Sequence, residues 1–304
     1  MKKKLAVYPF SEDVLPLFRH CDKIKMYDLK YGILPMGWKN SIANQFVIIK
    51  EEDFVSHNKD CDADALLLCK TKHSDNENLQ NRMVKLANMK EMEIIYDTSL
   101  EHIIANITND TCPLGQCKIK PPKNNAEIFP INVPIIMIAG MGENCNKWEL
   151  QLDLYSFFIK QGYNAKLISS NSLSDIMNMH VFPHDIDSKG LTFSQQVNSI
   201  NSFVKEVELT EKPDVIIMGI PGGIVKYSGK IPNGYGYLPY LISNALTPDI
   251  TILSLYCGEY EQKHTEDLKS IFQYRFGVNL GYYHMSNKTV NYDVETRELE
   301  YVNI

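Results

Sequence analysis

Residues 133–170 constrain the fold of this chain more than any other stretch. The sequence begins with an apolar, β-favouring run from Val133 to Ala139, passes through a glycine-containing loop, and continues as a helical pattern that ends near Gly162. A second apolar run, 164–169, follows. This order predicts strand, loop, helix and strand, the unit from which parallel sheets are built. Because the N–H groups of such a loop and of the first helical turn point at one spot, the unit also predicts an anion site.

The same alternation runs through the first third of the chain. Residues 4–10, 23–29 and 93–97 are expected to be strands, and 78–92 a helix. The β-α-β order predicts a parallel sheet with helices on both faces, of the flavodoxin or Rossmann type, although no GxGxxG motif occurs.

A proline-containing stretch then suggests a domain boundary. Residues 109–130 contain four prolines around a polar middle, as linkers do. We therefore expect an α/β protein of two doubly wound, mostly parallel-sheet domains. Residues 1–110 would form a Rossmann- or flavodoxin-like domain, 111–130 a linker, and 131–304 a domain resembling a P-loop NTPase with a degenerate phosphate loop.

The loop after Ala139 departs from the standard phosphate loop, GxxxxGK[ST], in which the lysine reaches the β- and γ-phosphates and the hydroxyl holds Mg²⁺. The lysine is present as Lys147, but it follows Asn146, and Trp148 takes the hydroxyl position. Met141 stands where the first glycine belongs. The residues of this loop that we expect to bind a nucleotide or phosphate are Gly140, Gly142, Glu143, Asn144, Asn146, Lys147 and Trp148.

Magnesium would need other ligands, because the hydroxyl is missing. Glu143, Asp185 and Asp187 are the carboxylates that could supply them. The expected cofactor is then ATP or GTP with Mg²⁺. Two alternatives stay open: the loop binds an anion without hydrolysing it, or its glycines serve only a tight turn between strand and helix.

A second glycine-containing loop follows Asp214 and the apolar run 215–220. Pro221, Gly222 and Gly223 would let a ligand or another backbone approach closely, but the strand ends without the carboxylate that usually accompanies a phosphate loop. Since both loops follow strands, both belong at the carboxyl edge of a parallel sheet, where ligands of open α/β sheets bind. We therefore add these three residues to the expected nucleotide site.

Composition excludes several classes of protein. The net charge of −6 argues against a nucleic-acid or anionic-membrane surface, and the apolar run after the first lysines is too short for a signal peptide or a membrane helix. We expect a cytoplasmic protein. The seven cysteines show no zinc-like pairing and are expected to be free thiols. Cys145, at the mouth of the first loop, could be reactive, although no partner base is identifiable.

Several segments resemble an accessory protein family found beside radical SAM enzymes in bacterial peptide-maturation clusters. The resemblance covers nearly the whole chain, and the loop and the PGG strand are its most specific pieces. The segments are KKKLAVYPF, GMGENCNKWELQL, EKPDVIIMGIPGGI, YLISNALTPDITILS and YRFGV.

This resemblance implies a role in maturing a ribosomally synthesised, post-translationally modified peptide (RiPP), with a precursor peptide or a radical SAM maturation enzyme as partner. The second domain is similar to the dethiobiotin-synthetase-like branch of P-loop proteins, which implies a homodimer. Three hypotheses follow: an accessory factor that binds nucleotide, with at most weak NTPase activity; a non-catalytic scaffold or peptide-binding protein with a vestigial nucleotide site; or an ATP-dependent ligase-like enzyme.

Overall fold

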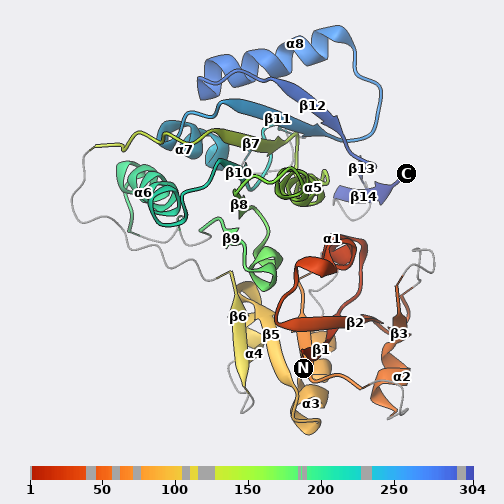
Figure 1. Ribbon diagram of the computed structural model, residues 1–304. Helices are drawn as coiled ribbons and strands as arrows, with labels where there is room; N and C mark the ends of the chain where they lie inside the picture. Colours follow the sequence, from red (N-terminus) through yellow and green to blue (C-terminus); the bar gives the residue numbers. More distant parts are fainter. Residues whose placement is uncertain are drawn as a thin grey trace. The chain divides into compact units, whose positions relative to one another are not determined.

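The chain folds into two α/β units, each built on a six-stranded parallel sheet (Figure 1). The computed structural model describes residues 2–38, 46–56, 62–70, 77–104, 110–115, 127–183, 186, 190–226, 235–292 and 299–304. Contacts group Met1–Gln116 with Ser172–Met179 as unit 1, and Cys117–Asn171 with His180–Ile304 as unit 2. Both sheets confirm the predicted α/β class.

In unit 1 the strands lie in the order β3-β2-β1-β4-β5-β6, and every neighbouring pair is parallel. The chain builds outward from β1 on one side and restarts with β4 on the other, so the strand order reverses between β1 and β4. The strands are β1 (Lys3–Tyr8), β2 (Tyr27–Leu34), β3 (Ile48–Lys50), β4 (Ala65–Leu68), β5 (Glu93–Asp97) and β6 (Thr111–Leu114).

One core of unit 1 lies between the sheet and its helices, and alternate residues of its strands point into it. Ala6 and Tyr8 of β1, with Leu66 and Leu68 of β4, pack against buried residues of α2, α3 and α4 such as Met83. The helices of this unit are α1 (Leu15–Arg19), α2 (Glu51–Val55), α3 (Glu77–Met89) and α4 (Glu101–Ile104).

In unit 2 the order is β12-β11-β7-β10-β8-β9, again parallel throughout. The first strand, β7, therefore lies between β10 and β11. The strands are β7 (Ile135–Gly140), β8 (Ala165–Ser169), β9 (His180–Val181), β10 (Val215–Gly219), β11 (Ile250–Leu255) and β12 (Tyr282–Met285). Near the C-terminus, β13 (Lys288–Tyr292) and β14 (Leu299–Asn303) form a separate antiparallel pair.

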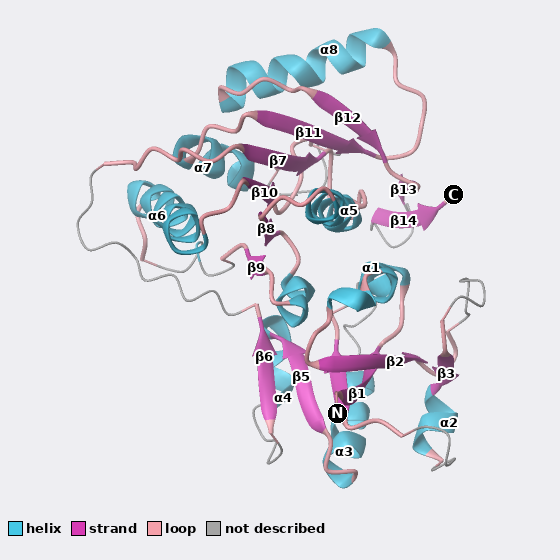
Figure 2. Cartoon of the chain, in the orientation of Figure 1, coloured by secondary structure: helices cyan, strands magenta, loops and turns pink. Residues whose placement is uncertain are grey.

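The two faces of this sheet are covered by different helices (Figure 2). Ile135, Met137 and Ala139 of β7 join a large core with α6, α7 and α8, whereas Ile136, between them in sequence, packs with Ala165 and Val215 near α5. The helices are α5 (Lys147–Lys160), α6 (Phe193–Glu211), α7 (Tyr237–Ala245) and α8 (Gln262–Ile271), which continues as a π-helical turn, Phe272–Phe276.

Two features correct the predicted domain boundaries. Thr111–Leu114, expected to begin the linker, forms β6, because its backbone pairs with β5. Ser172–Met179, expected within the second domain, groups with unit 1. Its 3₁₀ helix, Ser172–Met177, is held there by two polar contacts: the Gly115 N–H donates to the Asp175 carboxylate at 2.9 Å, and the Ser172 hydroxyl donates to Asp97.

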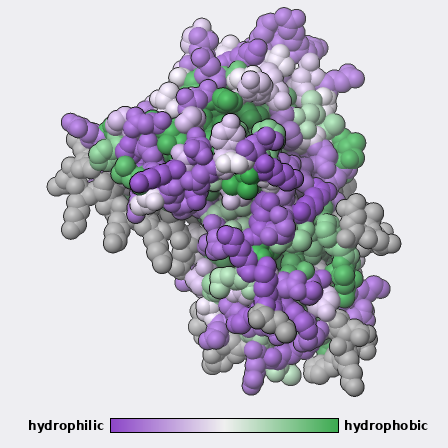
Figure 3. Space-filling model, in the orientation of Figure 1, coloured by the Kyte–Doolittle hydropathy of each residue, from purple (hydrophilic) through white to green (hydrophobic). Residues whose placement is uncertain are grey.

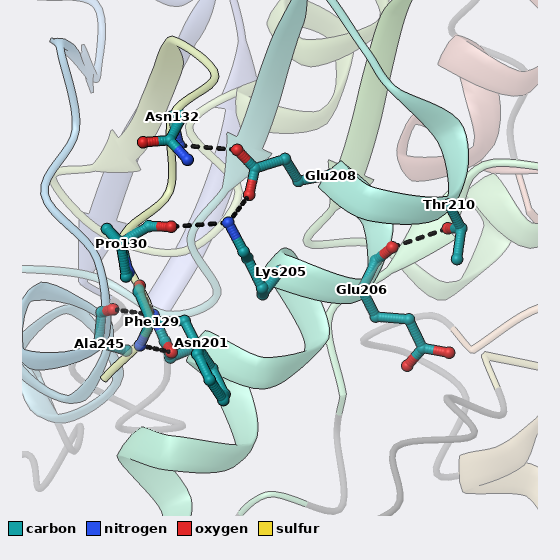
Figure 4. A network of polar contacts seen from close by, with 9 residues as sticks. All are labelled: Phe129, Pro130, Asn132, Asn201, Lys205, Glu206, Glu208, Thr210 and Ala245. Carbon is teal, nitrogen blue, oxygen red and sulfur yellow. Dashed lines mark hydrogen bonds and ion pairs between the residues drawn. The ribbon is translucent and has the colours of Figure 1, made fainter. Parts of the chain in front are cut away.

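The segment that enters β7 is fixed by side chains of α6 (Figure 4). Asn201 is buried; its Oδ1 accepts from the Phe129 N–H at 2.7 Å, and its Nδ2 donates to the carbonyls of Phe129 at 2.9 Å and Ala245 at 3.0 Å. One turn on, Lys205 donates to the Pro130 carbonyl at 2.8 Å. These bonds hold the start of β7, and hence the loop at its other end, against the body of unit 2.

The described residues contain no helix long and apolar enough to cross a membrane. On the face shown in Figure 3, hydrophobic residues surface only in separated areas among hydrophilic ones.

Replacing Asn201 with leucine should lower the free energy of unfolding by about 2–4 kcal/mol, because backbone groups of Phe129 and Ala245 lose their partners. Urea denaturation measures the change. Thr210→Ala is the matched control on the same helix, since the exposed Thr210 hydroxyl donates to the Glu206 carbonyl one turn earlier in the helix and supports no other segment among the described residues. It should cost less than about 0.5 kcal/mol; equal losses for the two variants would contradict this account of α6.

Candidate functional site

The loop between β7 and α5 touches the loop after β10. A methyl group on Gly223 would lie 2.6 Å from the Cα atom of Gly142, so only glycine permits this backbone approach. Next to it, the Ile224 N–H donates to the Gly140 carbonyl at 3.1 Å and the Val225 N–H to the Met141 carbonyl at 3.1 Å. The two glycine loops predicted to converge at the carboxyl edge of the sheet are therefore in contact.

The loop is held from its other side by the end of β11. The Met141 N–H donates to the Ser254 carbonyl at 2.8 Å. The buried Ser254 hydroxyl donates to the Cys145 carbonyl, and the Tyr256 hydroxyl to the Glu143 carbonyl. Hydroxyl groups at the end of β11 thus fix carbonyls of the loop that follows the neighbouring strand, β7.

These contacts orient the backbone of the whole loop. Its carbonyls at 140, 141, 142, 143 and 145 accept bonds from flanking amides, from hydroxyls or from the Cys145 thiol. Asn144 and Asn146 adopt left-handed conformations, with φ of 52° and 55°. Left-handed residues alternating with others turn successive N–H groups to one side and form an anion-binding concavity. The loop is thereby set in shape before any ligand arrives.

Lys147 begins α5, and its side chain runs back over Gly140, where a methyl group would lie 2.6 Å from the lysine Cδ. Only 8% of the residue is exposed. Its amino group donates to the carbonyls of Ile220, at 3.1 Å, and Gly222. Burial lowers the pKa of Lys147, and the nearby Cys145 and Glu143 oppose the change in part. An ammonium group has three donors, and two carbonyls among the described residues accept from this one, which leaves one donor for a ligand.

The other predicted residues of the loop take different positions. Trp148, in place of the hydroxyl, is buried, whereas Glu143 is exposed. Asn146 donates through its side chain to Asn287 and forms no cap bond to α5. Cys145, expected at the mouth of the loop, is instead fully buried, and its thiol donates to the Gly142 carbonyl at 3.2 Å.

Of the three predicted metal ligands, Glu143 alone lies in the part of the chain that is described. No group of three or more His, Cys, Asp or Glu side chains there is placed to hold a metal ion. Asp185 and Asp187 lie outside the described residues, so their pairing with Glu143 stays a prediction.

Strands β11 and β12 also contribute to this site, which the sequence did not predict. Ser254 Oγ lies 2.8 Å from Nδ1 of His284 on β12. Because the serine proton goes to the Cys145 carbonyl, the imidazole donates from Nδ1 and its Nε2 is the acceptor. Burial lowers the pKa of His284, with Asp153 and Glu149 opposing. In the sequence, the available signal was Ser254 and Tyr256, polar residues near the end of the apolar run 250–255. Only the strand order, in which β11 pairs with β7, places them beside the loop.

Comparisons with known proteins address the fold alone. No protein-family profile matches the chain, and no curated protein matches it in sequence. Among solved structures, the crystal structure of a DUF1611 family protein from Anabaena variabilis is similar, with a TM-score of 0.62 at 10% sequence identity, over 94% of this chain and 88% of that one. The likeness supports the two-sheet α/β architecture.

Burial of Lys147 should make stability depend on pH. The pKa of Lys147 in the folded protein lies below its value of about 10.5 in the unfolded chain. At a pH between these two pKa values, Lys147 is protonated in the unfolded chain and mostly neutral in the folded protein. The free energy of unfolding therefore rises with pH in this range. Urea denaturation from pH 7 to pH 10 should show this rise, at most about 1.4 kcal/mol per pH unit, in the wild type relative to Lys147→Met. If the free energy of unfolding changes with pH in the same way in both proteins, burial does not shift the pKa of Lys147.

Proposed function

We propose that unit 2 binds the phosphate groups of a nucleotide, ATP or GTP, at the loop 140–147, and that the protein is an accessory factor in maturation of a RiPP. The observation that carries the proposal of phosphate binding is the buried Lys147 amino group, which lies beside this loop. Carbonyls of the loop accept hydrogen bonds from neighbouring segments, such as the bonds from Ser254 and Tyr256. An anion at this loop would meet N–H groups and an ammonium.

The helix that follows strengthens the attraction for an anion. α5 has 14 residues, and its first-turn N–H groups have no partner within the helix. The aligned peptide dipoles add roughly half a positive charge at this end. Lys147 supplies a further donor at the same place, so a phosphate group is the ligand that fits the combined charge best.

Binding of phosphate would also affect the loop after β10. The Lys147 amino group now donates to the carbonyls of Ile220 and Gly222, on the loop that approaches Gly142. A phosphate that competes for this amino group would weaken those two bonds. The loop at Pro221, Gly222 and Gly223 would thereby respond to the ligand, which is a physical route from nucleotide binding to a partner.

The accessory role rests on the resemblance of the segments around the loop, the PGG strand and the late YRFGV to proteins encoded beside radical SAM enzymes. In this role the partner is the precursor peptide or the maturation enzyme, and the nucleotide controls loading or release. The two α/β units provide separate surfaces for a nucleotide and a macromolecule.

A scaffold with a vestigial nucleotide site is the second candidate. It is favoured by the two carbonyls that already satisfy Lys147, by the buried Trp148 at the hydroxyl position, and by the absence of a carboxylate directly after β10 in the sequence. In that case Lys147 joins two loops and does nothing else.

Isothermal titration of the full chain with ATP and GTP, each with and without Mg²⁺, separates the two candidates. The wild type should bind, and Lys147→Met should bind about tenfold to a hundredfold more weakly, the loss of one charge-assisted hydrogen bond. Lys160→Met, at the exposed far end of α5, is the matched control and should bind like the wild type. If neither nucleotide gives a heat of binding with folded wild-type protein, the scaffold function is the one that remains.

The accessory role predicts a change in peptide modification. In a reaction reconstituted from a radical SAM maturation enzyme and its precursor peptide, adding this protein with nucleotide should increase the yield of modified peptide measured by mass spectrometry. Lys147→Met should remove most of the increase, and Lys160→Met should not. An unchanged yield, with the enzyme active, would contradict the role.

A further inference from the structure

The outer strand of the unit 2 sheet, β12, lacks the protection that sheet edges usually have. An edge strand presents unpaired N–H and C=O groups, and proteins shield them with very short strands, lysines or prolines. The other three outer strands of the two six-stranded sheets carry such devices: β3 has three residues and ends at Lys50, β6 contains Pro113, and β9 has two residues. β12, Tyr282–Met285, has four residues and contains neither lysine nor proline.

The side chains of β12 are open to solvent. Tyr282 is 61% exposed, Met285 48% and Tyr283 36%. The strand order of the sheet ends at β12 (Figure 1), and among the described residues no strand pairs with its outer side. Because alternate N–H and C=O groups of an edge strand point away from the sheet, a row of main-chain donors and acceptors lies beside these three side chains.

Neighbouring residues of β12 point to opposite faces of the sheet. The Tyr283 hydroxyl donates to the Thr265 carbonyl of α8 at 2.8 Å, which fixes that ring on the α8 face. Tyr282 pairs in register with Ile252, which packs against the small core near α5 on the other face. A strand added to β12 would therefore meet a large side chain on each face, and such cross-strand pairs stabilise a sheet.

The strand is also connected to the phosphate loop. Nδ1 of His284, the third residue of β12, lies 2.8 Å from Ser254 Oγ, and the Ser254 hydroxyl donates to the Cys145 carbonyl. Negative charge lies on the same face, because Asp153 and Glu149 of α5 act on His284 and oppose the lowering of its pKa. A ligand at this edge would therefore be favoured by positive charge, and it would lie two hydrogen bonds from the loop.

The size of this edge favours a peptide over a second copy of the chain. A stable dimer buries about 800 Å² on each partner, and a fully buried aromatic side chain contributes about 150–250 Å². The two tyrosines, the histidine and the methionine of β12 are already partly covered and fall short of that area. An extended peptide needs less contact, because its own main chain supplies the hydrogen bonds that hold it to a sheet edge.

We propose that β12 binds an extended peptide, apolar in its middle and basic at its ends, as an added strand of the unit 2 sheet. The main-chain groups of β12 bond the peptide, and Tyr282, Tyr283 and Met285 contact its alternate side chains. The identity of this peptide as a RiPP precursor rests on the proposed function, whereas the docking itself requires no nucleotide.

Isothermal titration of the full chain with the peptide acetyl-Lys-Val-Thr-Val-Thr-Val-Lys-amide, without nucleotide, tests the docking. Because the main chain supplies most of the affinity, this probe should bind with a Kd near or below about 1 mM. The same peptide with N-methyl groups on its five central residues keeps every side chain and loses those main-chain donors, so it should bind at least tenfold more weakly. No binding of the first peptide, or equal binding of both, overturns the proposal.

Variants locate the binding on β12. Met285→Lys introduces the kind of charge with which natural edges exclude added strands, and it should weaken binding of the first peptide tenfold or more. Tyr282→Lys should do the same, which covers the case in which Met285→Lys does not fold. Tyr274→Lys adds the same charge at a tyrosine that is 82% exposed outside the strand, and it should bind like the wild type. Wild-type binding in the folded β12 variants would overturn the assignment.

Sedimentation velocity tests for a second copy at the same edge. Met285→Lys should leave the oligomeric state of the wild type unchanged. A wild-type dimer that Met285→Lys converts into monomers, while Tyr274→Lys remains a dimer, would assign the edge to a second copy and overturn the proposal. Because the peptide titrations contain no nucleotide, their failure leaves the ATP and GTP results standing, and a failure of nucleotide binding leaves the peptide result standing.

Discussion

The close approach of two backbones, at Gly142 and Gly223, is the constraint on which the site in unit 2 depends. No side chain larger than hydrogen fits between the two backbone segments. Their closeness lets the amides of Ile224 and Val225 reach the carbonyls of Gly140 and Met141. With those carbonyls occupied on one side, and those of Glu143 and Cys145 occupied by Tyr256 and Ser254 on the other, the loop has one shape available. The position of the Lys147 side chain follows from that shape.

The local part of this arrangement could be predicted from the sequence. The run 133–139, the glycine loop and the helix after it are encoded within 30 residues, and each signal, β propensity, glycine and helical periodicity, acts over a few residues. The convergence of the two glycine loops also followed, because parallel strands place their carboxyl ends at one edge. The nucleotide itself is a proposal that the geometry supports.

What the sequence could not provide are the contacts that depend on strand order. Ser254, Tyr256 and His284 matter because β11 lies beside β7 and β12 beside β11, and no local pattern encodes that adjacency. Similarly, Thr111–Leu114 contains a proline and looked like a linker, but an edge strand tolerates proline. The second strand, expected at 23–29, runs from Tyr27 to Leu34, because pairing with β1 and β3 overrides its glycine.

The excursion of Ser172–Met179 into unit 1 has a consequence for how the protein can be divided. The backbone passes between the units three times, after Gln116, after Asn171 and after Met179, so neither unit is a continuous piece of chain. A fragment that stops at residue 116 would lack Ser172, which donates to Asp97, and Asp175, which accepts from the Gly115 amide. No single cut in the chain therefore separates the two units.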